Sequence, residues 1–333
     1  MTQRYYLANS QRSRFTMPTT GSSLMHATNW LGTAMLCLLL SSPLFAAAPE
    51  ASPPQPVDTV SLAVYPPQIT LNSGVDFQSF AAVSTGGDGV TEDVTETARW
   101  RVIDPEIAKI DGQRLLPLAD GQTQLVANLN GVITRVDVTV DQAELVPDIS
   151  FAKDVMPVFT RSGCNTGSCH GAARGKDGFR LSLFGFDPAG DYHRITREFG
   201  FRRINLAVPS ESLLLKKAVG DVPHTGGRLF DDKSDYYETI HRWLQAGAPA
   251  DSPDAMPPAV QSIAVYPPQM VIQGEGNRQR LVAVAHYADG STRDLSRLAT
   301  FSSNNSSVAA VSEEGAITAG SSVKGATRCA LPA

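Results

Sequence analysis

Cysteine is scarce in this chain, with only four in 333 residues. Small exported folds that depend on disulfides are far denser in cysteine, so hydrophobic cores must hold this chain together. Cys37 lies in an apolar run near the N-terminus, and Cys329 stands alone near the other end. Cys164 and Cys169 are the only two that lie close together in the sequence.

Positive charge is also in short supply. The chain has 28 Lys and Arg against 33 Asp and Glu, and three of the basic residues lie in residues 1–48, which hold no acid. Without that segment the balance is 25 basic to 33 acidic residues, a net charge of −8. Such a chain lacks the basic surface that binds nucleic acids or anionic membranes. We therefore expect no nucleic-acid partner and no specific membrane lipid.

Long apolar runs are missing except for one at residues 31–48. This run is rich in Leu and Ala, is short for a membrane span, follows a basic leader and ends in three alanines. It predicts a secretory signal peptide at 1–48, followed by a Pro-rich linker at 49–56. An uncleaved N-terminal anchor is the alternative. We expect an exported protein of the periplasm or cell surface.

Recognisable catalytic groups are missing as well. The sequence shows no serine or cysteine nucleophile with a matched base, and no convincing pair of catalytic carboxylates. Gly-rich strings such as residues 185–190 carry no phosphate-loop lysine and indicate turns. These features favour a carrier or a scaffold over an enzyme.

An internal repeat sets the architecture. Residues 61–69, SLAVYPPQI, recur as SIAVYPPQM at 262–270, a shift of 201 positions. The same shift maps Trp100 onto Phe301, so the register holds for 40 residues and indicates two copies of one domain. Alternating apolar residues, Asp-Gly turns and frequent Val and Thr predict a small antiparallel β-sandwich for each copy.

The copies span residues 57–143 and 259–333. The tail at 324–333 is poor in β-branched residues, so we expect the second copy to be incomplete and the chain to be C-terminally truncated. Repeated aspartates offer either calcium ligands or, more simply, turn-forming side chains: Asp88, Asp93, Asp289 and Asp294.

The segment between the copies, residues 146–250, has helical periodicity. Apolar residues at 151, 155, 158 and 159 predict a first helix capped by Ser150, with Pro157 placing its regular start near Val155. Residues 237, 240, 243 and 244 predict a closing helix that ends before Gly247. A linker at 251–258 then leads to the second copy.

The string CNTGSCH, residues 164–170, lies in this helical segment. Two cysteines followed directly by a histidine are typical of c-type haem attachment, in which the thiols form thioethers and the histidine binds the iron. The usual gap between the cysteines is two residues and here it is four, so the surplus must bulge, and Gly167 offers the positive φ that a bulge often needs. A short disulfide or a metal site is the alternative.

Together these segments resemble a known family. The strings at 150–159, 209–218 and 240–249, with the widened motif, resemble the planctomycete-type cytochrome c domain, and the repeats resemble bacterial Ig-like group 2 domains. The family's large exported proteins usually continue into two domains of unknown function. The resemblance implies a multidomain protein in which all-β Ig-like sandwiches flank a small, mainly α cytochrome c-like domain. It further implies one covalent haem c on Cys164 and Cys169, with His170 as the proximal iron ligand.

The second iron ligand departs from the family's commoner pattern. Where those members supply the methionine of a Met-Pro-Pro string, this chain has PHTGG at 223–227, which makes His224 the candidate distal ligand. Rivals are Met256, which stands in a later Met-Pro-Pro, and two further histidines, His193 and His241. Met156 is expected in the core, and an open or water-bound position is a further alternative.

The sequence therefore predicts an exported monohaem c-type cytochrome that carries single electrons to or from a redox partner protein. The Ig-like domains would serve as spacers or docking modules, with contact to the cell surface or a polysaccharide. The alternative is a cell-surface adhesion or scaffold protein with a Cys164–Cys169 disulfide and no haem. A haem enzyme would need an open iron position. Several basic side chains could bind haem propionates or simply lie in solvent: Arg180, Arg202, Arg203, Lys216 and Lys217.

Overall fold

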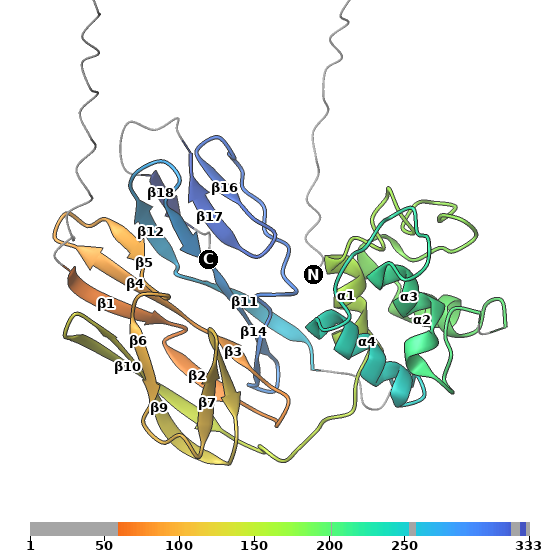
Figure 1. Ribbon diagram of the computed structural model, residues 1–333, viewed down its shortest axis with the longest axis horizontal. Coiled ribbons are helices and arrows are strands. Elements are labelled where there is room, and N and C mark those ends of the chain that lie inside the picture. The colour runs from red at the N-terminus through yellow and green to blue at the C-terminus, as the bar shows by residue number, and fades with distance from the viewer. Residues whose placement is uncertain (1–58, 201, 253–257, 321–326, 331–333) are drawn as a thin grey trace, which may run out of the picture. The chain divides into compact units, whose positions relative to one another are not determined.

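The computed structural model describes residues 59–330 except 201, 253–257 and 321–326. The expected signal peptide, the Pro-rich linker, Met256 and most of the linker at 251–258 lie outside the described residues. The described chain belongs to one compact unit, residues 55–333, and is mostly β-sheet with few helices (Figure 1). Among the described residues, no helix is both long and apolar enough to cross a membrane.

We call residues 59–140 the first β unit. Its sheets have the orders β1-β4-β5, β2-β10-β9-β6 and β3-β8-β7. The strands are β1 (Thr59–Tyr65), β2 (Gln68–Leu71), β3 (Gln78–Ser79), β4 (Ala81–Gly86), β5 (Thr91–Asp93), β6 (Arg99–Val102), β7 (Ala108–Asp111), β8 (Arg114–Pro117), β9 (Gly121–Leu129) and β10 (Val132–Val140). All pairs are antiparallel except β2 with β10, which is parallel. The expectation of a purely antiparallel sandwich is wrong at that pair.

The core of the first β unit follows from side-chain alternation. In β10, Val136 and Val138 are buried while Arg135 and Asp137 are exposed. The buried valines share one cluster with residues of the other sheets and with Phe80, whose ring lies 4.4 Å from that of Trp100. This cluster contains most of the buried apolar residues of the unit and gives it a core of its own.

We call residues 260–330 the second β unit. Its strands are β11 (Val260–Tyr266), β12 (Gln269–Ile272), β13 (Arg278–Arg280), β14 (Val282–Tyr287), β15 (Thr292–Asp294), β16 (Ala309–Val311), β17 (Ala316–Ala319) and β18 (Thr327–Ala330). The first five repeat β1 to β5 at the shift of 201 positions. Both units have a cis proline at the same place, Pro66 and Pro267.

The second β unit departs from the first near its end. β18 pairs antiparallel with β12, in the place where the first unit has the parallel strand β10. The described residues at the position of β6 form no strand there. In the first unit β6 pairs with β9, and no strand pairs at the corresponding place among the described residues of the second. The tail at 324–333, which lacked strand-forming composition, thus contributes a short strand.

We call residues 150–250 the helical unit. It contains a five-residue π-helix (Phe151–Val155), α1 (Met156–Arg161), a 3-10 turn (Leu183–Gly185), α2 (Pro188–Thr196), a 3-10 turn (Pro209–Glu211), α3 (Leu213–Val219) and α4 (Asp235–Gln245). The Ser150 side chain accepts a hydrogen bond from the Lys153 amide, which confirms the expected cap. Pro157 has no N–H to offer the Lys153 carbonyl, and that carbonyl accepts from Arg293 instead, at 3.1 Å.

The two apolar stripes predicted from the sequence form the core of the helical unit. Ile240, Trp243 and Leu244 of α4 are fully buried, and the rings of Phe151 and Trp243 lie 5.2 Å apart. The indole N–H of Trp243 donates to the Pro249 carbonyl at 3.0 Å, so its one polar atom is paired. The core lies beneath the loop that carries the two cysteines, because Cys164 packs against it.

Candidate haem-attachment site

The Cys164–His170 segment is a compact loop closed by its own backbone. The Cys169 amide donates to the Thr166 carbonyl at 3.0 Å, and the His170 amide donates to the Cys164 carbonyl at 3.0 Å. The loop begins with the Cys164 amide on the Phe159 carbonyl of α1, at 2.9 Å. The end of α1 and the motif are thereby fixed to each other.

The gap between the cysteines has a buried start, Asn165, and an exposed end, Gly167 and Ser168. Asn165 is fully buried, and its side-chain amide donates to Thr160 at 3.0 Å. The positive φ of the turn belongs to Gly163, at 73°, and not to Gly167. The longer gap is absorbed by folding Asn165 inward, because its side chain finds a partner on α1.

Gly171 is required by the close approach of the loop to itself. A Cβ atom at this position would lie 2.0 Å from the Asn165 carbonyl oxygen, which no side chain tolerates. The same carbonyl accepts from the Phe184 amide at 3.2 Å. The glycine after the histidine therefore lets three stretches of backbone meet around Asn165.

His170 is oriented by a backbone carbonyl. Its Nδ1 lies 3.0 Å from the Phe179 oxygen, and a carbonyl can only accept, so Nδ1 carries the proton and Nε2 keeps its lone pair. The His170 carbonyl in turn accepts from the Leu181 amide at 2.8 Å. Burial lowers the pKa of His170, which favours the neutral ring that a metal ion needs.

His224 is held in the same way from another segment. Its Nδ1 lies 3.3 Å from the Gly227 oxygen, within a tight turn closed by the Gly227 amide on the His224 carbonyl at 2.9 Å. Because a carbonyl can only accept, Nδ1 is again the donor of this hydrogen bond. The turn brings the imidazole over Gly226, where a Cβ atom would lie 3.0 Å from the ring.

The rings of the two histidines lie close together, although 54 positions separate them in the sequence. Their ring centroids lie 6.2 Å apart and their planes differ by 6°. Two imidazoles on opposite sides of one metal ion, each with a metal–nitrogen bond of about 2.0 Å, have centroids about 6 Å apart. The separation of the two rings thus agrees with the distance expected for one iron bound by both histidines.

The two cysteines are free thiols. Burial, and to a smaller extent the nearby Cys169, raise the pKa of the Cys164 thiol to about 12. A thiol that stays protonated at neutral pH is a poor nucleophile, so Cys164 is unsuited to act as a reactive cysteine. Its place on the core surface suits a structural attachment point instead.

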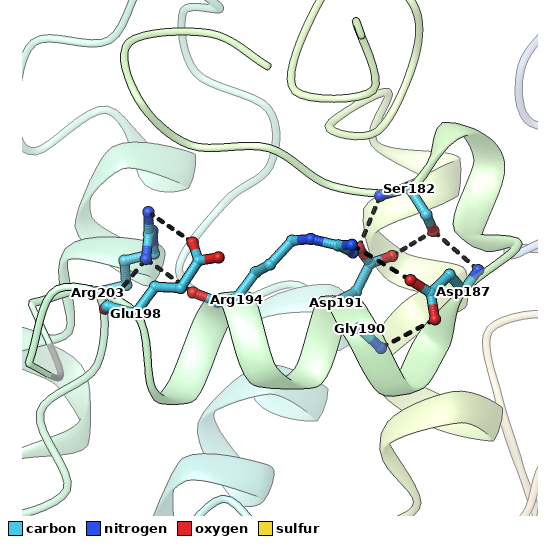
Figure 2. A network of polar contacts seen from close by, with 7 residues as sticks. All are labelled: Ser182, Asp187, Gly190, Asp191, Arg194, Glu198 and Arg203. Atoms are coloured by element: carbon cyan, nitrogen blue, oxygen red, sulfur yellow. Dashed lines mark hydrogen bonds and ion pairs between the residues drawn. The ribbon is translucent and has the colours of Figure 1, made fainter. Parts of the chain in front are cut away.

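A polar network fixes residues 179–182, the segment that hydrogen-bonds to His170. Asp191 of α2 is fully buried and accepts from the Ser182 amide at 2.6 Å, from the Ser182 hydroxyl and from Arg194 at 2.8 Å (Figure 2). Asp187 caps α2 through the Gly190 amide at 3.0 Å. The network fixes residue 182 to α2, and with it the neighbouring residues that bind the backbone and ring of His170.

Arg203 completes this support. Its guanidinium donates to the carbonyls of Arg194 at 2.7 Å and Gly178 at 3.3 Å and lies 4.3 Å from the centre of the Phe179 ring. Its carboxylate partner is Glu198, at 3.7 Å (Figure 2). Arg203 is thus engaged with the protein's own backbone, which explains its presence without a haem propionate. Lys216 is likewise paired, with Glu211.

The rival iron ligands are used elsewhere or lie outside the described chain. His193 is exposed on α2, and the His241 ring stacks on that of Tyr237 at 5.5 Å. Met156 is 3 % exposed and belongs to the core, as expected. Met256 lies outside the described residues.

Apolar side chains stand in solvent next to the cysteine loop. Phe184 and Phe186 are 62 % and 79 % exposed, and Phe184 has a φ of 53°, uncommon for a residue with a side chain. The backbone amide of Phe184 donates to the Asn165 carbonyl, and the Leu183 side chain lies close to Gly167. An apolar ligand bound to this loop would contact exposed apolar surface beside it.

No protein-family model and no curated protein sequence matches the chain. Within the described residues, no group of three or more His, Cys, Asp or Glu gathers in the manner of an all-protein metal site. A site with two protein ligands on one ion requires the remaining ligands to come from a bound group.

The sequence did not indicate the supporting residues Phe179 and Asp191, and it offered Arg203 only as a propionate ligand or a solvent-exposed charge. Their roles depend on backbone carbonyls and on a bend of the chain between residues 178 and 203, which no local pattern reports. The only signal was Asp187 before Pro188, a typical helix start that predicts α2.

Proposed function

We propose that this protein is an exported c-type cytochrome that binds one haem c and carries single electrons. The observation that carries the proposal is the parallel pair of His170 and His224, each with Nδ1 on a backbone carbonyl. The neighbouring Cys164 and Cys169 supply the two thiols that covalent attachment needs. In this proposal the helical unit is the cytochrome c-like domain and the two β units are Ig-like domains.

Each residue of the site has a separate task in this proposal. Cys164 and Cys169 anchor the group, His170 binds on the proximal side and His224 on the distal side. The carbonyls of Phe179 and Gly227 would each hold one ring through Nδ1 and leave Nε2 as the nitrogen that binds the iron. Leu183 and Phe184 provide apolar cover beside the loop.

A bound haem supplies the one-electron ferric–ferrous couple. Two imidazole ligands favour the ferric state more than an imidazole–thioether pair does, so the protein would have a lower reduction potential than a methionine-ligated relative. With His170 and His224 both binding the iron, no position would be left for a small molecule, so the site would suit electron transfer. The β units then serve as spacers or docking modules, with a redox protein as partner.

The test is the full chain made in a bacterium that has haem-attachment machinery. We expect the mature mass to exceed the polypeptide mass by one haem, and the haem to survive acid–acetone extraction. The spectrum should be six-coordinate and low-spin in both oxidation states, without the long-wavelength band of a methionine–ferric bond. His224→Met should create that band and raise the potential, and His224→Ala should open the iron to carbon monoxide.

His193→Ala, on an exposed histidine of the same unit, is the matched control and should leave the spectrum unchanged. A colourless protein in which Cys164 and Cys169 are oxidised to each other would refute the proposal and support the adhesion or scaffold alternative. An unchanged spectrum in His224→Ala would refute His224 as ligand.

A further inference from the structure

Equivalent residues of the two β units touch each other. Tyr65 and Tyr266, which correspond at the shift of 201 positions, stack with ring centroids 5.7 Å apart and planes 22° apart. Beside them, Ala81 shares one buried cluster with Val282, its own counterpart. A residue meets its own counterpart only where a two-fold axis relates the two copies.

Hydrogen bonds on either side of these tyrosines are reciprocal. The Asp93 carboxylate of the first unit accepts from the Arg280 amide of the second at 2.8 Å. The counterpart of Asp93 is Asp294, whose carboxylate accepts from the amide of Ser79, the counterpart of Arg280. Each aspartate uses its other oxygen to close a turn within its own unit. The turn role expected for these aspartates is thus confirmed, with a second role added.

A second reciprocal pair lies further out. The Thr91 hydroxyl exchanges hydrogen bonds with the backbone of Val271, at 2.9 Å from its amide and 3.1 Å to its carbonyl. Thr292, the counterpart of Thr91, donates to the carbonyl of Thr70, the counterpart of Val271, at 3.4 Å. In both cases a contact from the first unit to the second is repeated by the equivalent residues from the second unit to the first. Such reciprocity defines an isologous interface.

The interface contains buried polar groups whose loss of a hydrogen-bond partner would destabilise the protein. Asp294 is 5 % exposed, and its counterpart Asp93 is half-buried, so each carboxylate depends on the amide that the other unit donates. The equivalent glutamines Gln78 and Gln279 are also almost fully buried and fold back in the same way, each donating to the next residue's carbonyl. Polar side chains that are buried and hydrogen-bonded at equivalent positions of both units are expected of a specific interface. They are not expected of two domains that are only joined by a linker.

We propose that this face of each β unit is a self-complementary pairing surface whose partner is a second copy of the same unit, which the chain supplies to itself by duplication. The two β units then act as one body, and the helical unit is a loop of chain held at both ends by that body. This inference does not depend on haem.

The decisive experiment cleaves the chain between the first β unit and the helical unit and measures whether the two β units stay associated. A specific protease site is placed in the full chain between residues 143 and 148, and the cut protein is passed over a size-exclusion column without denaturant. We expect the fragment ending near residue 143 to elute with the rest of the chain. Because Arg114 of this fragment also binds Asp235 of the helical unit, the same result is expected with Arg114→Ala. Separation of the two fragments would overturn the proposal.

Two variants test the symmetry. Thr91→Arg and Thr292→Arg place a bulky charge at equivalent points of the interface, so both should separate the cut fragments. Glu92→Arg is the matched control, because Glu92 is exposed on the same strand and its side chain points to the other face. Separation in only one of the two threonine variants, or in the control as well, would contradict a reciprocal surface.

A cross-link keeps the test decisive should a variant fold poorly. Photo-oxidation with persulfate as oxidant removes one hydrogen from each of two adjacent phenols and joins the rings by a carbon–carbon bond. The uncut wild-type chain should give a Tyr65–Tyr266 dityrosine peptide in monomeric protein, and Tyr65→Phe should abolish it. A dityrosine found only in dimers would show that the second copy comes from another chain, and its absence would refute the stacking on which the axis rests.

Discussion

At the residue scale, the Cys164 thiol combines burial with a position in the candidate site. Its pKa is raised to about 12 by burial, so in protein made without haem attachment it stays a thiol at neutral and mildly alkaline pH. We expect iodoacetamide to modify Cys164 slowly, with a rate that rises about tenfold per pH unit until the thiol ionises. Peptide mass spectrometry over a pH series measures this, and a pH-independent rate would contradict it.

Asp191 is the residue whose loss should cost the helical unit most. Its buried carboxylate binds Ser182 and Arg194, and Asp191→Ala leaves that arginine, which is 15 % exposed, without its closest partner. We expect about 3 kcal/mol of destabilisation, measured by urea unfolding of the far-ultraviolet helical signal. Glu198→Ala removes a half-exposed carboxylate from a longer ion pair and should cost less than about 1 kcal/mol. Equal losses would show that burial at Asp191 is unimportant.

At the element scale, the conformation of the cysteine loop requires a glycine at position 171 but not at position 167. Gly171→Ala forces the new Cβ against the Asn165 carbonyl, so the loop must open and haem attachment should fall severalfold. Gly167→Ala is the matched control within the same loop, because its nearest neighbour, a methyl of Leu183, is 3.9 Å away. Haem content per chain and the thermal midpoint measure both variants. Comparable losses in the two would refute the role assigned to Gly171.

At the scale of the whole molecule, the helical unit and the paired β units should differ in their response to salt. Charged contacts connect the helical unit to both β units: Asp235 with Arg114 and Arg297, Asp154 with Arg293, and Arg161 with Glu313. Partly exposed ion pairs weaken as salt rises, whereas the tyrosine and amide contacts between the β units do not. After cleavage at 143–148 and at 251–258, high salt should release the helical unit while the β units stay together. Size-exclusion chromatography at low and high salt tests this, and release of a β unit first would contradict it.

Much of the fold is readable from local pattern. The stripe on α4 and the Ser150 cap depend on residues within a few positions of one another, and the repeat at a shift of 201 positions depends on matching short strings. Each is confirmed. The parallel pairing of β2 with β10 was not readable, because it joins strands more than 60 residues apart and leaves no mark in either strand's alternation.

The candidate site divides in the same way. The sequence by itself determined the two thiols, the adjoining His170 and the repeat, since covalent neighbours and duplicated strings need no folding to be recognised. It also offered His224 as one of several histidines without a reason of geometry to prefer it. Only the tertiary structure brought the His224 ring parallel to that of His170 and set Asp93 and Asp294 across a two-fold axis. Those relations are distances between segments far apart in the chain, and only the packing of the whole molecule fixes such distances.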